Sequence, residues 1–187
     1  MSRVPRYDLL FEPVRIGPVT ARNRFYQVPH CAGMGHREPS ASAAMRAMKA
    51  EGGWAVVCTE ECDIHPASEF SPYAEARLWD DKDIPALARM AEAVKGHGAL
   101  AGIELAFNGA AAPNRLSREI PLAPSDTVVD PYDPVQARAM DRNDIRDLRR
   151  WHREAALRAR KAGFDIVYVY AGHDLGHFTF TDHLSVR

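Results

Sequence analysis

Arg22-Asn23-Arg24-Phe25-Tyr26-Gln27-Val28-Pro29-His30-Cys31 is the stretch of this 187-residue chain that decides its fold. Residues 25–28 include the aromatic and β-branched side chains typical of a strand, and the proline then ends that strand. A histidine and a thiol therefore follow directly at its carboxyl end. In a parallel α/β barrel, cofactors and catalytic groups gather at the carboxyl ends of the strands. His30 and Cys31 are for this reason candidate functional residues.

The rest of the chain alternates between two hydrophobic periods, which is typical of βα units. A short hairpin with a Gly-Pro turn is predicted over residues 9–20. The predicted strands are residues 23–28, 54–60, 99–105 and 164–170, and the predicted helices are residues 43–50, 83–96 and 144–163. Residues 108–133 are rich in proline and turn formers, so we expect a long loop with a functional role.

Four strands are too few to close an eight-stranded barrel, which typically takes about 250 residues. We therefore expect an α/β fold that is the N-terminal half of a TIM (β/α)8 barrel, with about four βα units preceded by the short hairpin. Residues 1–187 would form a single, truncated domain. Because a half-barrel exposes strand edges, it would form a homo-oligomer or require the missing C-terminal half. A small open sheet is the alternative.

Composition excludes several classes of protein. The net charge is −1, which gives no electrostatic basis for binding nucleic acid or an anionic membrane. No apolar run approaches the roughly 18 residues of a membrane span, and the N-terminus lacks the pattern of a signal peptide. Three cysteines, an odd number without paired spacing, indicate a reducing compartment. We expect a cytoplasmic protein that acts on a small molecule.

The polar residues at the predicted strand ends form the candidate site, since these ends should meet at one edge of a parallel sheet. They are Val28, Pro29, His30 and Cys31 after the first strand, Glu60, Glu61 and Cys62 at the second, Glu104 at the third, and Tyr170 and His173 at the fourth. A protonated histidine would lower the pKa of the neighbouring Cys31 thiol and supply a thiolate.

Each of these residues also has a plain structural interpretation. Cys31 would be a small buried hydrophobe, Glu104 would pair with an arginine inside the barrel, and Glu61 would be a solvated loop charge. Tyr170 and His173 would simply line the wall of the site.

Cys58, Cys62 and His65 have a spacing that could suggest a metal site. The spacing supplies three ligands at most, and no fourth ligand follows at a recognisable distance. We therefore predict no metal.

The opening stretch resembles the N-terminal flavin segment of the trimethylamine/dimethylamine dehydrogenase-like family, which belongs to the old yellow enzyme superfamily of NADH:flavin oxidoreductases. Further resemblance covers residues 8–13, 49–54, 76–80 and 111–114. The resemblance implies FMN, with Cys31 bonded through sulfur to C6 of the flavin and Glu104 accepting a hydrogen bond from its ring. It also implies flavin contacts from Val28, Pro29, His30 and Glu60, and a substrate side lined by Tyr170 and His173.

Three positions depart from the family pattern. Glu61 replaces an aromatic residue of a cage that binds a quaternary-like cation, and a carboxylate would pair instead with an ammonium or N–H group. Ala106 replaces tryptophan-sized bulk, which indicates a roomier pocket. Leu175 replaces a second tyrosine, so proton transfer through Tyr170 and His173 is shortened. The substrate expected from Glu61 and Ala106 is a larger or N–H-bearing amine.

The resemblance predicts an FMN-dependent oxidoreductase that oxidises a small amine. Hydride would leave the carbon next to nitrogen for the flavin, and water would hydrolyse the iminium ion to an aldehyde and a smaller amine. The alternatives are a demethylase of an N-methyl amino acid such as dimethylglycine, an ene-reductase, and a non-catalytic truncated half-barrel. A [4Fe–4S] cluster would be present only if the protein continues beyond residue 187, and the electron acceptor is not specified.

Overall fold

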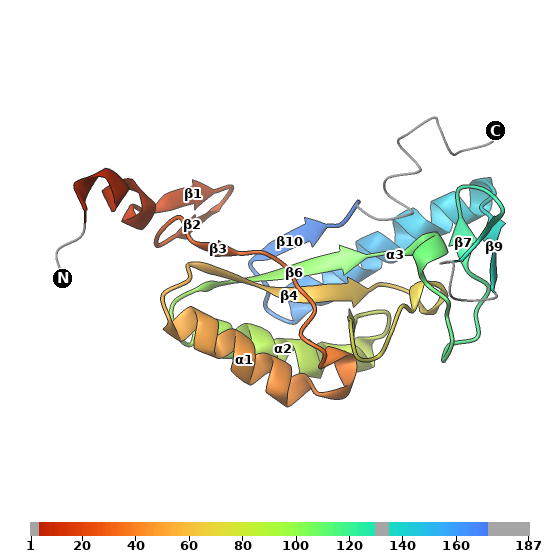
Figure 1. Ribbon diagram of the computed structural model, residues 1–187, viewed down its shortest axis with the longest axis horizontal. Helices are drawn as coiled ribbons and strands as arrows, with labels where there is room; N and C mark the ends of the chain where they lie inside the picture. The colour runs from red at the N-terminus through yellow and green to blue at the C-terminus, as the bar shows by residue number, and fades with distance from the viewer. Residues whose placement is uncertain (1–3, 130–134, 172–187) are drawn as a thin grey trace.

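The computed structural model describes residues 4–129 and 135–171. Its main sheet contains β3 (Tyr26–Gln27), β4 (Val56–Asp63), β6 (Leu100–Ala106) and β10 (Ile166–Val169), all parallel and adjacent in chain order (Figure 1). A short strand, β5 (Ala76–Arg77), adds to the carboxyl end of β4. The prediction of an α/β fold with a parallel sheet is confirmed, and the order of strands is that of consecutive βα units.

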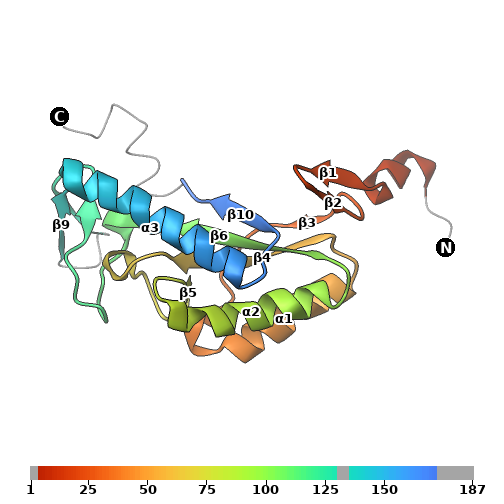
Figure 2. The ribbon, with the colours of Figure 1, turned by 180° about the vertical axis from the view of Figure 1, so that it is seen from behind.

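Three helices connect the strands: α1 (Pro39–Glu51), α2 (Ile84–Lys95) and α3 (Arg142–Lys161). All three lie on one face of the sheet: α1 and α2 are below it in Figure 1, and α3 crosses in front of it in Figure 2. The main core lies between this face and the helices, where Val57, Ile103 and Leu105 of the sheet pack with Leu87 and Met90 of α2. No helix of the described residues is both long and apolar enough to cross a membrane.

The N-terminal hairpin forms, but it is shorter than the expected residues 9–20, because residues 9–11 belong to a 3-10 helix. It pairs β1 (Val14–Ile16) with β2 (Val19–Ala21) in antiparallel register around a turn at Gly17. Its apolar side chains pack on the face of the sheet opposite the helices, at the amino ends of the strands, in a small cluster with Val56 and Cys58. Short 3-10 helices occur at Pro5–Phe11, Gly35–Arg37, Pro66–Ser68, Asp81–Asp83 and Gly109–Ala111.

The prediction of a long loop over residues 108–133 is wrong in part. It contains β7 (Leu122–Ala123) and β8 (Thr127–Val128), which pair with β9 (Gln136–Ala139) to form a second, small sheet. Strands β7 and β8 are each two residues long and pair with a strand further along the chain, so the local sequence pattern does not predict them. Residues 130–134 lie outside the described part of the chain.

Several boundaries differ from the prediction. The first strand is only two residues long. Before it, the Asn23 side chain accepts a hydrogen bond from Phe25 N–H and donates one to the carbonyl of Gly53, and these bonds replace backbone pairing between strands. Helix α1 begins at Pro39, a residue favoured in the first turn of a helix. Strand β4 continues to Asp63, and its register with β6 shifts between Cys58 and Glu61.

Gly35 lies where two loops contact each other at the carboxyl end of the sheet: the loop after β3 and the loop before β5. Gly35 has φ +51°, and a Cβ there would lie 2.2 Å from the carbonyl oxygen of Pro72 and 2.9 Å from that of Glu75. The next residue, His36, donates its backbone N–H to the same Glu75 carbonyl at 2.9 Å. Only glycine fits this contact, since its neighbours are backbone atoms that cannot rotate away.

Gly35→Ala should therefore lower the free energy of unfolding by about 2–4 kcal/mol, from left-handed strain and steric overlap together. Gly33→Ala is the matched control: Gly33 has φ +75° but nothing within 4 Å of an added Cβ, so only about 1 kcal/mol of strain is expected. Urea denaturation measures both values. Equal losses in the two variants would show that the loops are not in close contact.

Candidate functional site

The sheet face opposite the helices carries polar side chains toward the carboxyl ends of the strands; we call it the open face. Its central residue is Glu104 of β6, which is paired in register with Glu61 of β4 on one side and Tyr168 of β10 on the other. Paired residues of neighbouring strands share a face. The register shift in β4 matters here, because it brings Glu61 level with Glu104.

Cys31 is exposed and lies beside this group. Burial of part of its surface raises the pKa of the Cys31 thiol, and the Glu61 and Glu60 carboxylates raise it further. Cys31 is also close enough to Tyr170 to raise the pKa of its phenol electrostatically. The ends of the first, second and fourth strands therefore meet at one place. The structure thus brings Cys31, Glu61, Glu104 and Tyr170 together.

The expectation that a protonated histidine lowers the pKa of the Cys31 thiol is wrong for this structure. His30 faces helix α1, where its ring nitrogens lie 3.0 Å from both the Arg46 guanidinium and the Lys49 ammonium. Burial and these two cations lower the pKa of His30, so its imidazole stays neutral. A neutral ring supplies no positive charge to stabilise a thiolate.

Arg46 anchors the segment that carries Cys31. Its guanidinium is completely buried, forms an ion pair with Glu60 at 3.0 Å and donates to the His30 carbonyl at 2.6 Å. It also donates to the Gln27 side chain at 3.3 Å. One side chain of α1 therefore links the end of β3, the following loop and the middle of β4.

Glu60 has a different environment from the one the sequence suggested. Its carboxylate accepts from Arg46 and, at 3.4 Å, from the Ser42 hydroxyl, both on α1. It points to the helix side of the sheet, away from the open face. Contact between Glu60 and a cofactor stays a prediction, as it does for Pro29 and His30, whereas Val28 is 63% exposed and accessible.

Glu104 is 4% exposed, yet it forms no ion pair with the described residues. Burial and the neighbouring Glu61 carboxylate raise the pKa of Glu104 to about 7. Its backbone N–H donates to the Thr59 hydroxyl at 3.1 Å, which fixes the strand at this point. A carboxyl group with this pKa can accept or donate a hydrogen bond near neutral pH.

The fourth strand contributes two phenols. The rings of Tyr168 and Tyr170 lie 6.4 Å apart, and burial together with the Glu61 and Glu104 carboxylates raises the pKa of Tyr170 to about 12. Tyr170 therefore remains a phenol at neutral pH. His173, the other predicted member of this strand end, lies outside the described residues.

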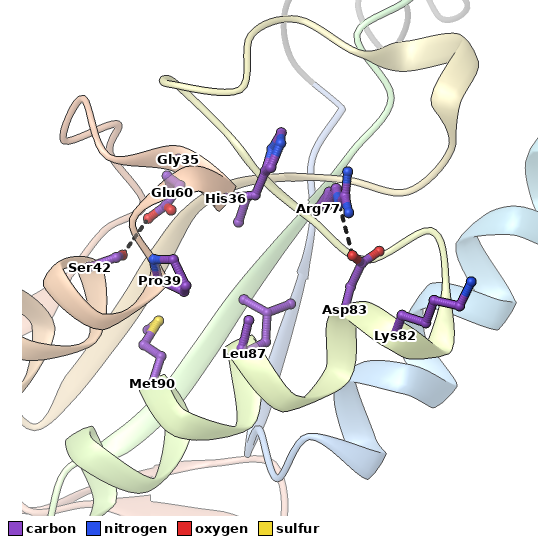
Figure 3. A pocket seen from close by; sticks show the side chains of 12 residues that line it. Gly35, His36, Pro39, Ser42, Glu60, Arg77, Lys82, Asp83, Leu87 and Met90 are labelled. Carbon is purple, nitrogen blue, oxygen red and sulfur yellow. Dashed lines mark hydrogen bonds and ion pairs between the residues drawn. The ribbon is translucent and has the colours of Figure 1, made fainter. Parts of the chain in front are cut away.

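The structure also has a cavity of about 190 Å³ on the helix side of the sheet, between α1 and α2 (Figure 3). Its lining includes the apolar side chains of Leu87 and Met90, and two interacting pairs, Ser42 with Glu60 and Arg77 with Asp83. Of the predicted site residues that the structure describes, only Glu60 lines it. We therefore place the candidate site on the open face.

The cysteines of the considered metal spacing lie apart. Cys58 belongs to the cluster under the N-terminal hairpin, whereas Cys62 is buried on the helix side of the same strand. His65 stacks on Trp151 of α3, with ring centroids 3.6 Å apart. Within residues 4–129 and 135–171, no group of three or more histidine, cysteine, aspartate or glutamate side chains is arranged to hold a metal ion.

Sequence reasoning missed several residues around this site. Arg46 is a buried cation in a helix of alanine and methionine, and its position four residues before Ala50 on the buried face was the available signal. Tyr168 follows from strand periodicity, since it lies two residues before Tyr170. Asp63 and Glu75 carry no local signal, because their proximity arises only when β5 pairs with β4.

The open face fits the ring portion of a flavin. It offers an exposed thiol in Cys31, the carboxyl group of Glu104, which can accept or donate a hydrogen bond, and the exposed side chains of Val28 and Tyr168. Buried polar groups without partners are destabilising, so a ligand that supplies a donor to Glu104 suits this face.

Comparison with known proteins points the same way. The sequence profile of the NADH:flavin oxidoreductase / NADH oxidase family matches residues 9–179. A dimethylamine dehydrogenase from Hyphomicrobium sp. (strain x) is 43% identical over 182 residues, which cover 94% of this chain and 25% of that protein.

Two solved structures are also similar. Histamine dehydrogenase from Rhizobium sp. 4-9 has a TM-score of 0.89 and 57% identity, covering 94% of this chain and 27% of that one. The 6-hydroxypseudooxynicotine amine oxidase from Pseudomonas geniculata N1 has a TM-score of 0.90 and 53% identity, covering 95% and 27%. The chain thus spans about a quarter of the length of these relatives.

Arg46→Met should lower the free energy of unfolding by about 3–5 kcal/mol, because it leaves the Glu60 carboxylate buried and unpaired. Adding Glu60→Gln should recover much of this loss, since the charge is removed. Arg150→Met is the control: Arg150 pairs with Asp147 on an exposed face, where a change below about 1 kcal/mol is expected. Urea denaturation distinguishes these cases, and a double variant no better than Arg46→Met would contradict the interpretation.

Glu104 should make stability depend on pH. Its pKa is raised from 4.5 to about 7, so the folded state holds a proton that the unfolded state releases between these values. The contribution of Glu104 to the free energy of unfolding is fully present below pH 4.5 and is lost as the pH rises through about 7. Glu104→Gln should remove this decline, which thermal unfolding across the range will show. Parallel curves for the two proteins would mean that Glu104 is not perturbed.

Proposed function

The chain belongs to the NADH:flavin oxidoreductase / NADH oxidase family, and we propose that it forms the ring-binding part of an FMN site in which a small amine is oxidised. Its relatives are flavin-dependent oxidoreductases, including amine dehydrogenases. The observation that carries the amine assignment is the Glu61 carboxylate, which lies beside Glu104, Cys31 and Tyr170 on the open face.

Each residue has a role in this proposal. Cys31 is the exposed thiol that would hold the flavin through a thioether bond, and Glu104 would accept a hydrogen bond from its ring system. Val28 would lie against the ring as an exposed apolar surface. The flavin, when bound, supplies the acceptor for a hydride from the carbon next to the substrate nitrogen.

The substrate would be an amine that carries an N–H group or a positive charge. Glu61 would accept a charge-assisted hydrogen bond from it, which is stronger than a bond between neutral groups. Tyr170, whose pKa is raised to about 12, would donate a hydrogen bond rather than act as a base. Ala106, at the end of β6, has a single methyl as its side chain and would take less space beside these groups than a larger residue.

An N-methyl amino acid such as dimethylglycine is the second candidate substrate, since Glu61 would pair equally well with its ammonium group. An additional carboxylate on that substrate would need a cation near Glu61. The carboxyl groups of Glu61 and Glu104 near Cys31 make the site acidic, which favours a simple amine.

The parallel sheet would form the first half of a TIM barrel. The adjacent order of β3, β4, β6 and β10 is that of a barrel, and the relatives are about four times longer than this chain. The remaining strands would cover the exposed edge of β10 and complete the flavin site. We also propose that the protein functions in the cytoplasm, where its three free cysteines stay reduced.

Intact mass of the purified, denatured protein tests the flavin link. We expect a gain of about one FMN, which disappears in Cys31→Ala, and no change in the control Cys58→Ala, whose thiol is buried beneath the hairpin. Turnover of dimethylamine against dimethylglycine then identifies the substrate class. A protein that carries no flavin when it is expressed at its full natural length would contradict the proposal.

A further inference from the structure

Three carboxyl groups lie together at the edge of the open face. Glu61 and Asp63 belong to β4, and Glu75 immediately precedes β5. The parallel register pairs Cys62 with Ala76 and Asp63 with Arg77, so continuing it by one residue places Glu75 beside Glu61. Glu75 is 1% exposed and Asp63 is 2% exposed.

Few donors reach this cluster. The Asn108 side-chain amide donates to Glu75 Oε1 at 3.0 Å, and Asn108 is itself held by Ser68, whose hydroxyl oxygen accepts its backbone N–H at 2.6 Å. The Phe70 backbone N–H donates to Asp63. The remaining oxygens, Asp63 Oδ1 and Glu75 Oε2, are buried and have no donor among the described residues.

Two ionised carboxylates cannot satisfy each other, since both only accept hydrogen bonds. A protonated carboxyl group can, because its O–H becomes a donor to the neighbouring oxygen. Leaving two buried acceptors unsatisfied would cost the desolvation energy of both. The geometry therefore requires at least one proton within the cluster.

The electrostatic environment agrees with a proton on this pair. Burial raises the pKa of Asp63 to about 8, and it raises the pKa of Glu75 well above its usual range, where the Asp63 carboxylate adds to the effect. Hydrogen bonds to Asp63 and Glu61 favour the protonated form of Glu75. The groups facing the cluster from the surrounding elements are mostly acidic: Glu60, Glu61 and Cys62 of β4, Glu69, Asp83, Arg77 of β5, and His36.

We propose that Glu75 positions the Glu61 carboxylate by donating a hydrogen bond to it, while Asp63 in its acid form and Asn108 each donate a hydrogen bond to Glu75. The Glu61 carboxylate is then an acceptor turned toward the open face, where it can pair with a substrate N–H group. This inference rests on the proposed function for its substrate. Glu75 and Asp63 touch neither substrate nor cofactor and act through Glu61 alone.

Two replacements of Glu75 separate hydrogen bonding from packing. Glu75→Met keeps a side chain of similar length but removes both the donor and the acceptor. Glu75→Gln restores them, because its amide nitrogen can donate to Glu61 while its amide oxygen accepts from Asn108. With the full-length holoenzyme and dimethylamine, we expect Glu75→Met to raise KM about tenfold with kcat little changed. Glu75→Gln should return KM to within about threefold of the wild-type value.

The dependence of KM on pH separates the two roles, because a residue that only packs would not change it. In the wild-type protein, KM should rise as the pH passes about 8, where Asp63 loses its proton and its carboxylate competes with Glu61 for the single O–H of Glu75. Glu75→Gln cannot lose that donor, so its KM should stay level over the same range. Equal KM values in the Met and Gln variants, or an unchanged alkaline rise in Glu75→Gln, would overturn the proposal.

A spectroscopic measurement distinguishes failure of this inference from failure of the proposed function. In protein labelled with ¹³C at the glutamate carboxyl carbon, one resonance should keep the chemical shift of a protonated acid at neutral pH and disappear in Glu75→Gln. This result does not depend on amine turnover. If no such resonance exists, Glu75 is ionised and the inference is wrong even when dimethylamine is oxidised.

Discussion

The buried ion pair between Arg46 and Glu60 is the interaction on which the rest of this structure depends. It joins helix α1 to strand β4 at 3.0 Å, and the same guanidinium holds the His30 carbonyl. Because breaking such a pair leaves a charge buried without a partner, the loop after β3 has one strongly favoured position. That position places Cys31 next to the carboxyl ends of the other strands.

Strand β4 separates two chemical environments. Its helix side holds Glu60 in an ion pair, whereas Glu61 one residue later faces the open side among acidic groups. Adjacent residues of a strand face opposite sides, and the bulge between Cys58 and Glu61 decides which glutamate faces which side, because it inserts one extra residue in β4 relative to β6. Two adjacent glutamates therefore have different electrostatic roles.

The open face concentrates acidic groups, and its central carboxyl, Glu104, forms no ion pair with the described residues. Glu104 with its pKa of about 7, the raised pKa of Cys31 and the carboxyl pair of Asp63 and Glu75 all follow from burial combined with like charge. Such a face is unfavourable unless protons or a cationic ligand compensate it. This balance connects the fold to the amine chemistry proposed above.

The sequence alone determined the alternation of strands and helices, the N-terminal hairpin and the identity of Cys31, Glu61, Glu104 and Tyr170 as strand-end residues, because local periodicity and turn residues encode these features. Tertiary structure decided that His30 is neutral, that Glu60 pairs with Arg46, and that Glu75 lies beside Glu61. Each of these depends on side chains distant in sequence, and a pKa is set by such neighbours. A single sequence contains the residues but not their distances.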